Sequence, residues 1–177
     1  MTLKKCSHWD ARFFLLCDMI ASWSEDTSRK VGSIVVGHSN EIRSTGYNGL
    51  PRGIDSSVSA RHDRASDEKY LWFEHAERNA IYNAAGSGTA TAGCRMYVNS
   101  FPCADCARAI IQCGITQLNT FEFDSTDEKF GRHFTVAEKM LLEGGVEIRK
   151  FARNDQAIID QVKLFSDVKN PENNLIR

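Results

Sequence analysis

Two short clusters in this 177-residue chain bring together side chains that can hold a metal ion and a carboxylate that can move protons. The stretch EHAERNAIYNAA places His75 two residues before Glu77, at the start of a pattern typical of a helix. The stretch FPCADC places Cys103 and Cys106 three residues apart, directly after Pro102. Because residues three apart in a first helical turn lie on one face, the two thiols can share one ion.

The donor set favours a catalytic metal centre over a structural one. Proline suits the first turn of a helix, and a thiol near a helix N-terminus loses its proton more easily. Cys103, Cys106 and His75 would give a metal ion three protein ligands and leave a fourth position open, which is the composition of a catalytic zinc site. A surface helix with two incidental cysteines is the alternative, and the agreement of residue type, spacing and setting argues against it.

The position of Glu77 predicts a reaction. H-x-E followed by P-C-x-x-C is the pattern of zinc-dependent nucleobase deaminases. In that chemistry water activated by the metal adds to C4 of a cytosine. We expect Glu77 to take a proton from the water, to deliver it to ring N3, and then to protonate the leaving amine.

The hydropathy pattern predicts the elements that carry these residues. Apolar residues at helical spacing indicate helices over 8–24, 74–85, 103–113, 135–145 and 154–168. Residues 30–49 read as a hairpin, and further strands are expected over 94–100, 115–123 and 146–151. Residues 50–70 are polar and irregular, which predicts a long loop. Strands alternating with helices predict a central sheet covered by helices on both faces.

Composition limits the classes of protein that the chain can belong to. Its net charge of −1 offers no basic patch for a polyanion, so nucleic acid is not the expected partner. No apolar run reaches membrane-spanning length, and no signal peptide is recognised. The six cysteines are read as reduced thiols or metal ligands, which predicts the cytoplasm. Without repeats or linkers we expect one domain over 1–177, with its core at about 9–168 and a polar tail at 169–177.

From about Phe13 to Phe151 the chain resembles the deoxycytidylate (dCMP) deaminases of the cytidine deaminase superfamily. The stretches that carry the resemblance are KVGSIVV, STGYNGLPRG, HAERNAIYNAA and SFPCADCARAIIQCGI. It implies an α/β fold, a three-layer α/β/α sandwich around a mixed five-stranded sheet. It also implies zinc-dependent hydrolysis of dCMP to dUMP and ammonia, as part of the supply of dTMP, and a homo-oligomer.

The resemblance also implies a substrate-binding set. Asn48 resembles the asparagine that holds the sugar and base side, and the backbone N–H of Ala76 resembles the donor to the pyrimidine carbonyl. Gly49 would let the backbone approach the substrate, although a turn glycine is an equal alternative. The first candidate for the cation that binds the 5′-phosphate is Arg52. Weaker candidates are Lys30 and Arg29.

Several alternatives stay open at this stage. The substrate could be cytidine, deoxycytidine, a 5-modified dCMP or a base in nucleic acid. A non-catalytic zinc-binding protein is a further alternative, but a structural site has no use for Glu77. A second metal through His62 is disfavoured, because Glu74 stands where some relatives have cysteine or histidine. Control by dCTP and dTTP is not assigned.

Overall fold

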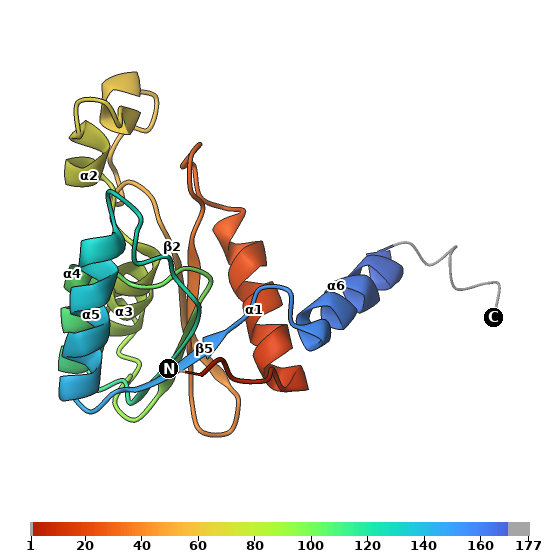
Figure 1. Cartoon of the computed structure of the whole chain (residues 1–177). Coiled ribbons are helices and arrows are strands. Elements are labelled where there is room, and N and C mark those ends of the chain that lie inside the picture. The colour runs from red at the N-terminus through yellow and green to blue at the C-terminus, as the bar shows by residue number, and fades with distance from the viewer. Residues whose placement is uncertain (1, 170–177) are drawn as a thin grey trace.

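A computed structural model describes residues 2–169, which form a mixed five-stranded sheet with helices on both faces (Figure 1). The strands are β1 (Gly32–Val36), β2 (Ile42–Tyr47), β3 (Arg95–Val98), β4 (Gln117–Phe121) and β5 (Glu147–Phe151). Their order is β2-β1-β3-β4-β5. β1 runs antiparallel to both β2 and β3, whereas β3, β4 and β5 are parallel. The expected three-layer α/β/α fold is therefore confirmed.

The described residues form six α-helices, four of which bury the two faces of the sheet. The six are α1 (His8–Ala21), α2 (Glu68–Trp72), α3 (Ala76–Gly86), α4 (Ala104–Gln112), α5 (Gly131–Glu143) and α6 (Gln156–Lys169), with a 3-10 turn η1 (Ser59–His62). On one face α1 packs against the sheet through Phe14, which contacts Phe121 and Phe151. On the other face α3, α4 and α5 cover Met96, Leu118 and their neighbours. Alternate residues of each strand therefore serve the two cores.

Two segments differ from the sequence-based expectation. The polar loop over 50–70 contains η1 and the start of α2, which its irregular pattern did not indicate. Helix α5 begins at Gly131 rather than at Thr135. The carboxylate of Asp127 explains the earlier start, since it accepts the N–H of Lys129 at 3.0 Å and that of Phe130 at 2.7 Å. Of the predicted polar tail, residues 170–177 lie outside the described part of the chain.

A glycine lets α3 lie directly against β2. A Cβ atom at Gly46 would collide with the backbone nitrogen of Ala80 and the carbonyl oxygen of Ala76, both in α3. The hydroxyl of Ser44, also on β2, donates to the carbonyl of Ala80 at 2.7 Å. The start of α3 is thereby fixed relative to the sheet, and this is the end of the helix that carries His75 and Glu77.

Within the described residues, no helix combines the length and apolar character that crossing a bilayer requires.

Candidate active site

Two helix N-termini bring the predicted metal donors together. His75 is the residue that caps α3, Cys103 caps α4, and Cys106 lies in the first turn of α4. The Nδ1 atom of His75 lies 3.4 Å from the Sγ atom of each cysteine, and the two sulfurs are 3.7 Å apart. Cys106 is fully buried, and Cys103 is nearly so. The three donors thus form a compact triangle although the sequence separates histidine from cysteine by 28 residues or more.

The triangle has the dimensions of one face of a zinc tetrahedron. With Zn–S distances of about 2.3 Å and Zn–N distances of about 2.0–2.1 Å, tetrahedral angles place two sulfurs about 3.8 Å apart and sulfur and nitrogen about 3.6 Å apart. The distances here agree with those values within a few tenths of an ångström. Two thiolates and one imidazole are ligands typical of zinc. The residues present therefore fit the ion.

The two cysteines differ in how readily they lose their protons. The hydrogen bond from Cys106 lowers the pKa of Cys103 far below its ordinary value, and a hydrogen bond to His75 adds to the effect. The same hydrogen bond to Cys103, together with burial, raises the pKa of Cys106. The pair therefore favours the thiolate form at Cys103 rather than at Cys106. Because both cysteines bind a metal as thiolates, metal affinity at this site would depend on pH.

Glu77 lies in the first turn of α3, with only 3% of its surface exposed. Burial raises the pKa of its carboxyl group, and the neighbouring His75 opposes that rise. A carboxyl group with a raised pKa binds and releases protons closer to neutral pH, as a general acid and base must. The arrangement at Glu77 suits proton transfer.

One pocket brings together two of the three metal donors, the carboxylate of Glu77 and several substrate candidates; we call it the central pocket. Its walls come from three separate parts of the chain, 26–48, 64–77 and 100–134. His75, Glu77 and Cys103 line it, as do the aromatic rings of Phe101 and Phe130. Aromatic walls beside a buried carboxylate exclude water from the place where protons would move.

Two of the predicted substrate residues, Asn48 and Ala76, line the central pocket. Most of the hydrogen-bonding capacity of the Asn48 side chain is used within the protein. Its Nδ2 donates to Asp26 and to the carbonyl of Arg29, each at 2.9 Å, and its Oδ1 accepts the N–H of Val31 at 2.8 Å. One lone pair of Oδ1 remains, so Asn48 could still accept a hydrogen bond from a donor group of a ligand. Ala76 begins α3, where the N–H groups have no intrahelical acceptor.

Arg52 and Gly49 lie elsewhere, and the structure does not bring them together with His75 and Glu77 in the central pocket. Both line a second hollow with Tyr47 and Tyr82, and the guanidinium of Arg52 donates to the side chain of Asn83. The cause is local, because β2 ends at Tyr47 and the chain then follows the outer side of α3.

The backbone of Gly49 is also occupied, since it exchanges two hydrogen bonds with Glu74. A Cβ atom at Gly49 would meet nothing closer than 3.6 Å, so no close approach requires a glycine there. Lys30 is turned away as well, with its Nζ atom 2.6 Å from the carbonyl oxygen of Ser24.

Three cations line the central pocket instead: Arg29, Arg64 and Lys69. Arg29 was a weaker candidate from sequence. Arg64 and Lys69 were missed, because both belong to the polar segment before His75, which carries no recognisable motif. Arg64 and Lys69 line the pocket only because this segment folds back over residues 24–31. The spacing of residues within the segment does not predict that fold.

His62, considered for a second metal, is half-buried and places its Nε2 atom 2.9 Å from the carbonyl oxygen of Ser56. Among residues 2–169, one group of three donors is close enough to hold an ion, and it is the group of His75, Cys103 and Cys106.

Comparison with known proteins identifies the family. Residues 7–122 match the model of the cytidine and deoxycytidylate deaminase zinc-binding region. The chain belongs to the cytidine and deoxycytidylate deaminases, enzymes that hydrolyse carbon–nitrogen bonds of cyclic amidines. The resemblance noted from the sequence is thereby confirmed, and so is the expectation of zinc as the cofactor.

Named relatives narrow the comparison. The chain is 37% identical over 146 residues to an uncharacterized deaminase in the luxG 3′ region of Aliivibrio fischeri, covering 80% of this chain and 92% of that protein. It is 36% identical over 148 residues to the deoxycytidylate deaminase of Homo sapiens, covering 81% and 79%. The fold matches a dCMP deaminase from the cyanophage S-TIM5, crystallised with dCMP and dUMP. That match has a TM-score of 0.66 at 22% identity and covers 84% of this chain and all of the other.

Proposed function

We propose that this protein is a zinc-dependent dCMP deaminase, which hydrolyses dCMP to dUMP and ammonia. The observation that carries the proposal is the burial of Glu77 in the pocket lined by His75 and Cys103, two members of a donor triangle of zinc dimensions. The names of its relatives support the nucleotide as substrate, because the human protein is a deoxycytidylate deaminase and the phage protein was crystallised with dCMP and dUMP.

The metal would be held by His75, Cys103 and Cys106. When bound, zinc supplies Lewis acidity at the coordination position that these three residues leave open. The two cysteines would balance its charge, and the start of α4 favours their thiolate forms. His75 and Cys103 line the central pocket, so the open position is assigned to the pocket side.

Glu77 would carry the protons of the reaction. It accepts one from the attacking water, passes it to ring N3 of the cytosine, and delivers the second to the amino group that leaves C4. Water and dCMP thus become ammonia and dUMP, and the carboxylate returns to its starting state. The N–H groups at the start of α3, that of Ala76 first, would donate to the pyrimidine carbonyl.

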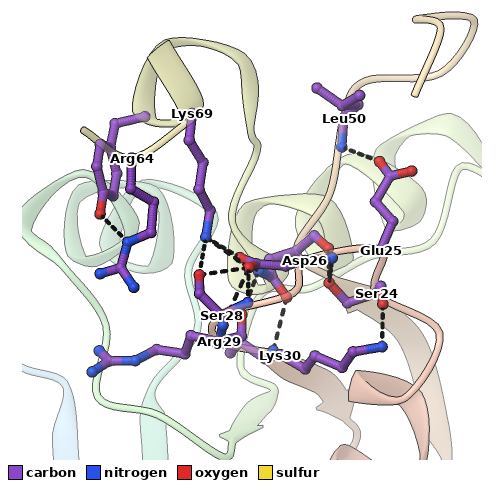
Figure 2. Close-up of polar contacts among 12 residues, drawn as sticks. Ser24, Glu25, Asp26, Ser28, Arg29, Lys30, Leu50, Arg64 and Lys69 are labelled. Carbon is purple, nitrogen blue, oxygen red and sulfur yellow. Dashed lines mark hydrogen bonds and ion pairs between the residues drawn. The ribbon is translucent and has the colours of Figure 1, made fainter. Parts of the chain in front are cut away.

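The 5′-phosphate is assigned to Arg29 and Arg64 in place of Arg52. Both line the central pocket, and neither forms an ion pair with a carboxylate of the described residues. Figure 2 shows the two side chains extending to the same side of the cluster around Asp26. Two guanidinium groups match the charge of a phosphate dianion and offer several donors to its oxygens.

The guanidinium groups are partly held in place before a ligand arrives. The guanidinium of Arg29 lies 5.5 Å from the ring centre of Phe130, and Nε of Arg64 donates to the hydroxyl of Tyr70 at 3.0 Å. An arginine whose orientation is already fixed loses less side-chain entropy when it binds phosphate.

An ammonia-release assay across cytidine, deoxycytidine, CMP, dCMP and dCTP tests the assignment. We expect dCMP to have the highest kcat/KM. Equal rates on deoxycytidine and dCMP would refute a phosphate-dependent enzyme, and the absence of ammonia from every compound would refute deamination of free cytosine nucleotides.

A single-domain protein that acts in the cytoplasm as a homo-oligomer completes the proposal. All six cysteines are free thiols, as a reducing compartment requires. Size-exclusion chromatography with light scattering tests the oligomer.

A further inference from the structure

We propose that the buried ion pair between Lys69 and Asp26 is a positioning device, which holds residues 24–31 and Asn48 in the arrangement that receives the nucleotide. The inference rests on the proposed function, because it assigns a role within that substrate site. It adds two residues to the site that neither bind the metal nor move a proton.

The pair links segments that are distant in the chain. Lys69, in α2, places its Nζ atom 2.7 Å from Oδ1 and 2.6 Å from Oδ2 of Asp26, although 43 residues separate them (Figure 2). Lys69 is 7% exposed and Asp26 is 3% exposed. A buried ion pair recovers the cost of removing two charges from water only when its other hydrogen-bonding positions are also filled.

The remaining acceptor positions of the Asp26 carboxylate are filled by groups of the proposed substrate-binding segments. Its Oδ1 atom accepts the backbone N–H of Ser28 at 2.8 Å and that of Arg29 at 3.2 Å. Its Oδ2 atom accepts Nδ2 of Asn48 at 2.9 Å. Burial alone would raise the pKa of Asp26, but the hydrogen bonds from Lys69 and Ser28 outweigh it and lower the pKa. One carboxylate therefore fixes the backbone that carries Arg29 and the amide of Asn48.

Lys69 lines the central pocket, but its ammonium group is already engaged by the protein. It donates to Oδ1 of Asp26 at 2.7 Å and to Oγ of Ser28 at 2.6 Å. Its Nζ atom also lies 2.6 Å from Oδ2 of the same carboxylate, so the ion pair holds the charge in place. Its charge is matched by Asp26, so the uncompensated positive charge of this part of the pocket belongs to Arg29 and Arg64. Lys69 is a positioning residue and not a phosphate ligand.

Loss of the pair should weaken substrate binding and spare the chemical step. Without Lys69, Asp26 would be a buried unpaired anion next to Arg29 and would draw that guanidinium away from a phosphate. Glu77 and the metal donors lie at the starts of α3 and α4, whereas the hydrogen bonds of the pair go to Ser28, Arg29 and Asn48. We therefore expect an effect on KM rather than on kcat.

The test compares Lys69→Met, Asp26→Asn and the double variant with Asp10→Asn, all at a temperature where each is folded and carries equal zinc. Asp10 is a matched control: it is equally buried, it is paired with Arg149 at 3.0 Å, and it belongs to the core between α1 and the sheet. We expect KM for dCMP, and Kd for dUMP measured by calorimetry, to rise at least about tenfold in both single variants, which corresponds to the loss of one charge-assisted hydrogen bond. We expect kcat to stay within about threefold, which indicates an intact transition-state arrangement.

The double variant removes both charges, so its KM should lie closer to the wild-type value than that of Lys69→Met. Asp10→Asn should lower the melting temperature and leave KM unchanged. If Lys69→Met is insoluble, Asp26→Asn, which preserves shape, decides the question alone.

Wild-type KM and Kd values in Lys69→Met and Asp26→Asn, with only the stability loss seen in Asp10→Asn, would overturn the inference. A loss confined to kcat would overturn it as well. Either result leaves the proposed function intact, whereas a wild-type protein that releases no ammonia from dCMP refutes the proposed function itself.

Discussion

Gly49 and Glu74 exchange two backbone hydrogen bonds, one of 3.0 Å from the N–H of Gly49 and one of 2.8 Å from the N–H of Glu74. This bridge joins the residue after Asn48 to the residue before His75. The backbone at Asn48, the proposed substrate amide, is therefore tied by main-chain hydrogen bonds to the backbone at His75, the proposed metal donor. Substitutions in the metal site should change zinc binding, and substitutions in the substrate site should change substrate binding, each without the other effect.

Replacing a donor should remove the metal. In Cys103→Ala the zinc affinity should fall by at least about 100-fold. Loss of a residue that only hydrogen-bonds to a metal ligand already costs up to about 100-fold, and Cys103 is itself a proposed ligand. Cys113→Ala is the control, because Cys113 is a half-buried cysteine at the opposite end of α4. Elemental analysis after dialysis against a weak chelator measures both. Retention of stoichiometric zinc in Cys103→Ala would refute the ligand assignment.

Replacing the carboxylate should preserve the metal and stop turnover. Glu77→Gln keeps the size of the side chain and loses its ability to shuttle protons, so kcat should fall by at least about 10² to 10⁴. Zinc content should equal that of the wild type. A Glu77→Gln enzyme with near-normal kcat and full zinc would contradict the proton-transfer role.

Three arginine variants test the phosphate assignment. Arg29→Ala and Arg64→Ala should each lower kcat/KM for dCMP about ten- to a hundredfold, because each removes a charge-assisted contact. Their kcat/KM for deoxycytidine should change little, so the ratio of kcat/KM for dCMP to that for deoxycytidine should fall. Arg52→Ala is the matched control, since Arg52 lines the second hollow. A preference that narrows only in Arg52→Ala would restore the original sequence-based choice.

Stability in acid should depend on Asp10. Burial would raise the pKa of this carboxyl group, but hydrogen bonds from Arg149, Ser7 and Tyr97 lower it overall. A carboxyl group with a lowered pKa in the folded state stabilises the fold above its unfolded pKa, about 3.9, and loses that contribution as the pH falls through its folded pKa. The difference in melting temperature between wild type and Asp10→Asn should therefore be full at pH 7 and shrink below about pH 4. A constant difference across that range would contradict this account.

The contact between β2 and α3 should tolerate no side chain. Gly46→Ala forces a methyl group into the backbone of α3, so we expect a stability loss of about 1–3 kcal/mol and reduced zinc retention as the start of α3 shifts. Gly86→Ala is the control, because a Cβ atom there meets nothing within 4 Å. Chemical denaturation of both variants measures the difference, and equal stability would refute the close-packing argument.

The two parts of the metal site were predictable because each has a local spacing, and the combined motif of H-x-E and P-C-x-x-C predicted that they meet. The spacing of Cys103 and Cys106 fixes their relation within one helical turn, and Glu77 lies two residues from His75. The alternation of apolar strands and amphipathic helices likewise predicted the layers of the fold. Patterns of this kind depend on residues that are close together in the sequence, so they can be recognised without knowledge of the tertiary packing.

The cations of the pocket were not predictable by the same means. Arg52 stands in the most recognisable motif, yet the chain turns it to the outer side of α3. Arg64 and Lys69 reach the pocket only because α2 folds back over residues 24–31, a contact between segments some 40 residues apart. The start of α5 was misjudged for a related reason, since the carboxylate of Asp127, ahead of the apolar pattern, organises it.

The pairing of Lys69 with Asp26 also limits how this enzyme can be redesigned. One route to a changed substrate preference is to replace the polar segment over 50–73 with that of another deaminase. Such an exchange would bring in a new surface loop. It would also remove the partner of Asp26, a buried aspartate in a different part of the chain. Such a graft should succeed only when the donor segment brings a lysine that reaches the same place, or when Asp26 is replaced with it. The loop and residues 24–31 are thus one exchangeable unit, although they are not contiguous in the gene.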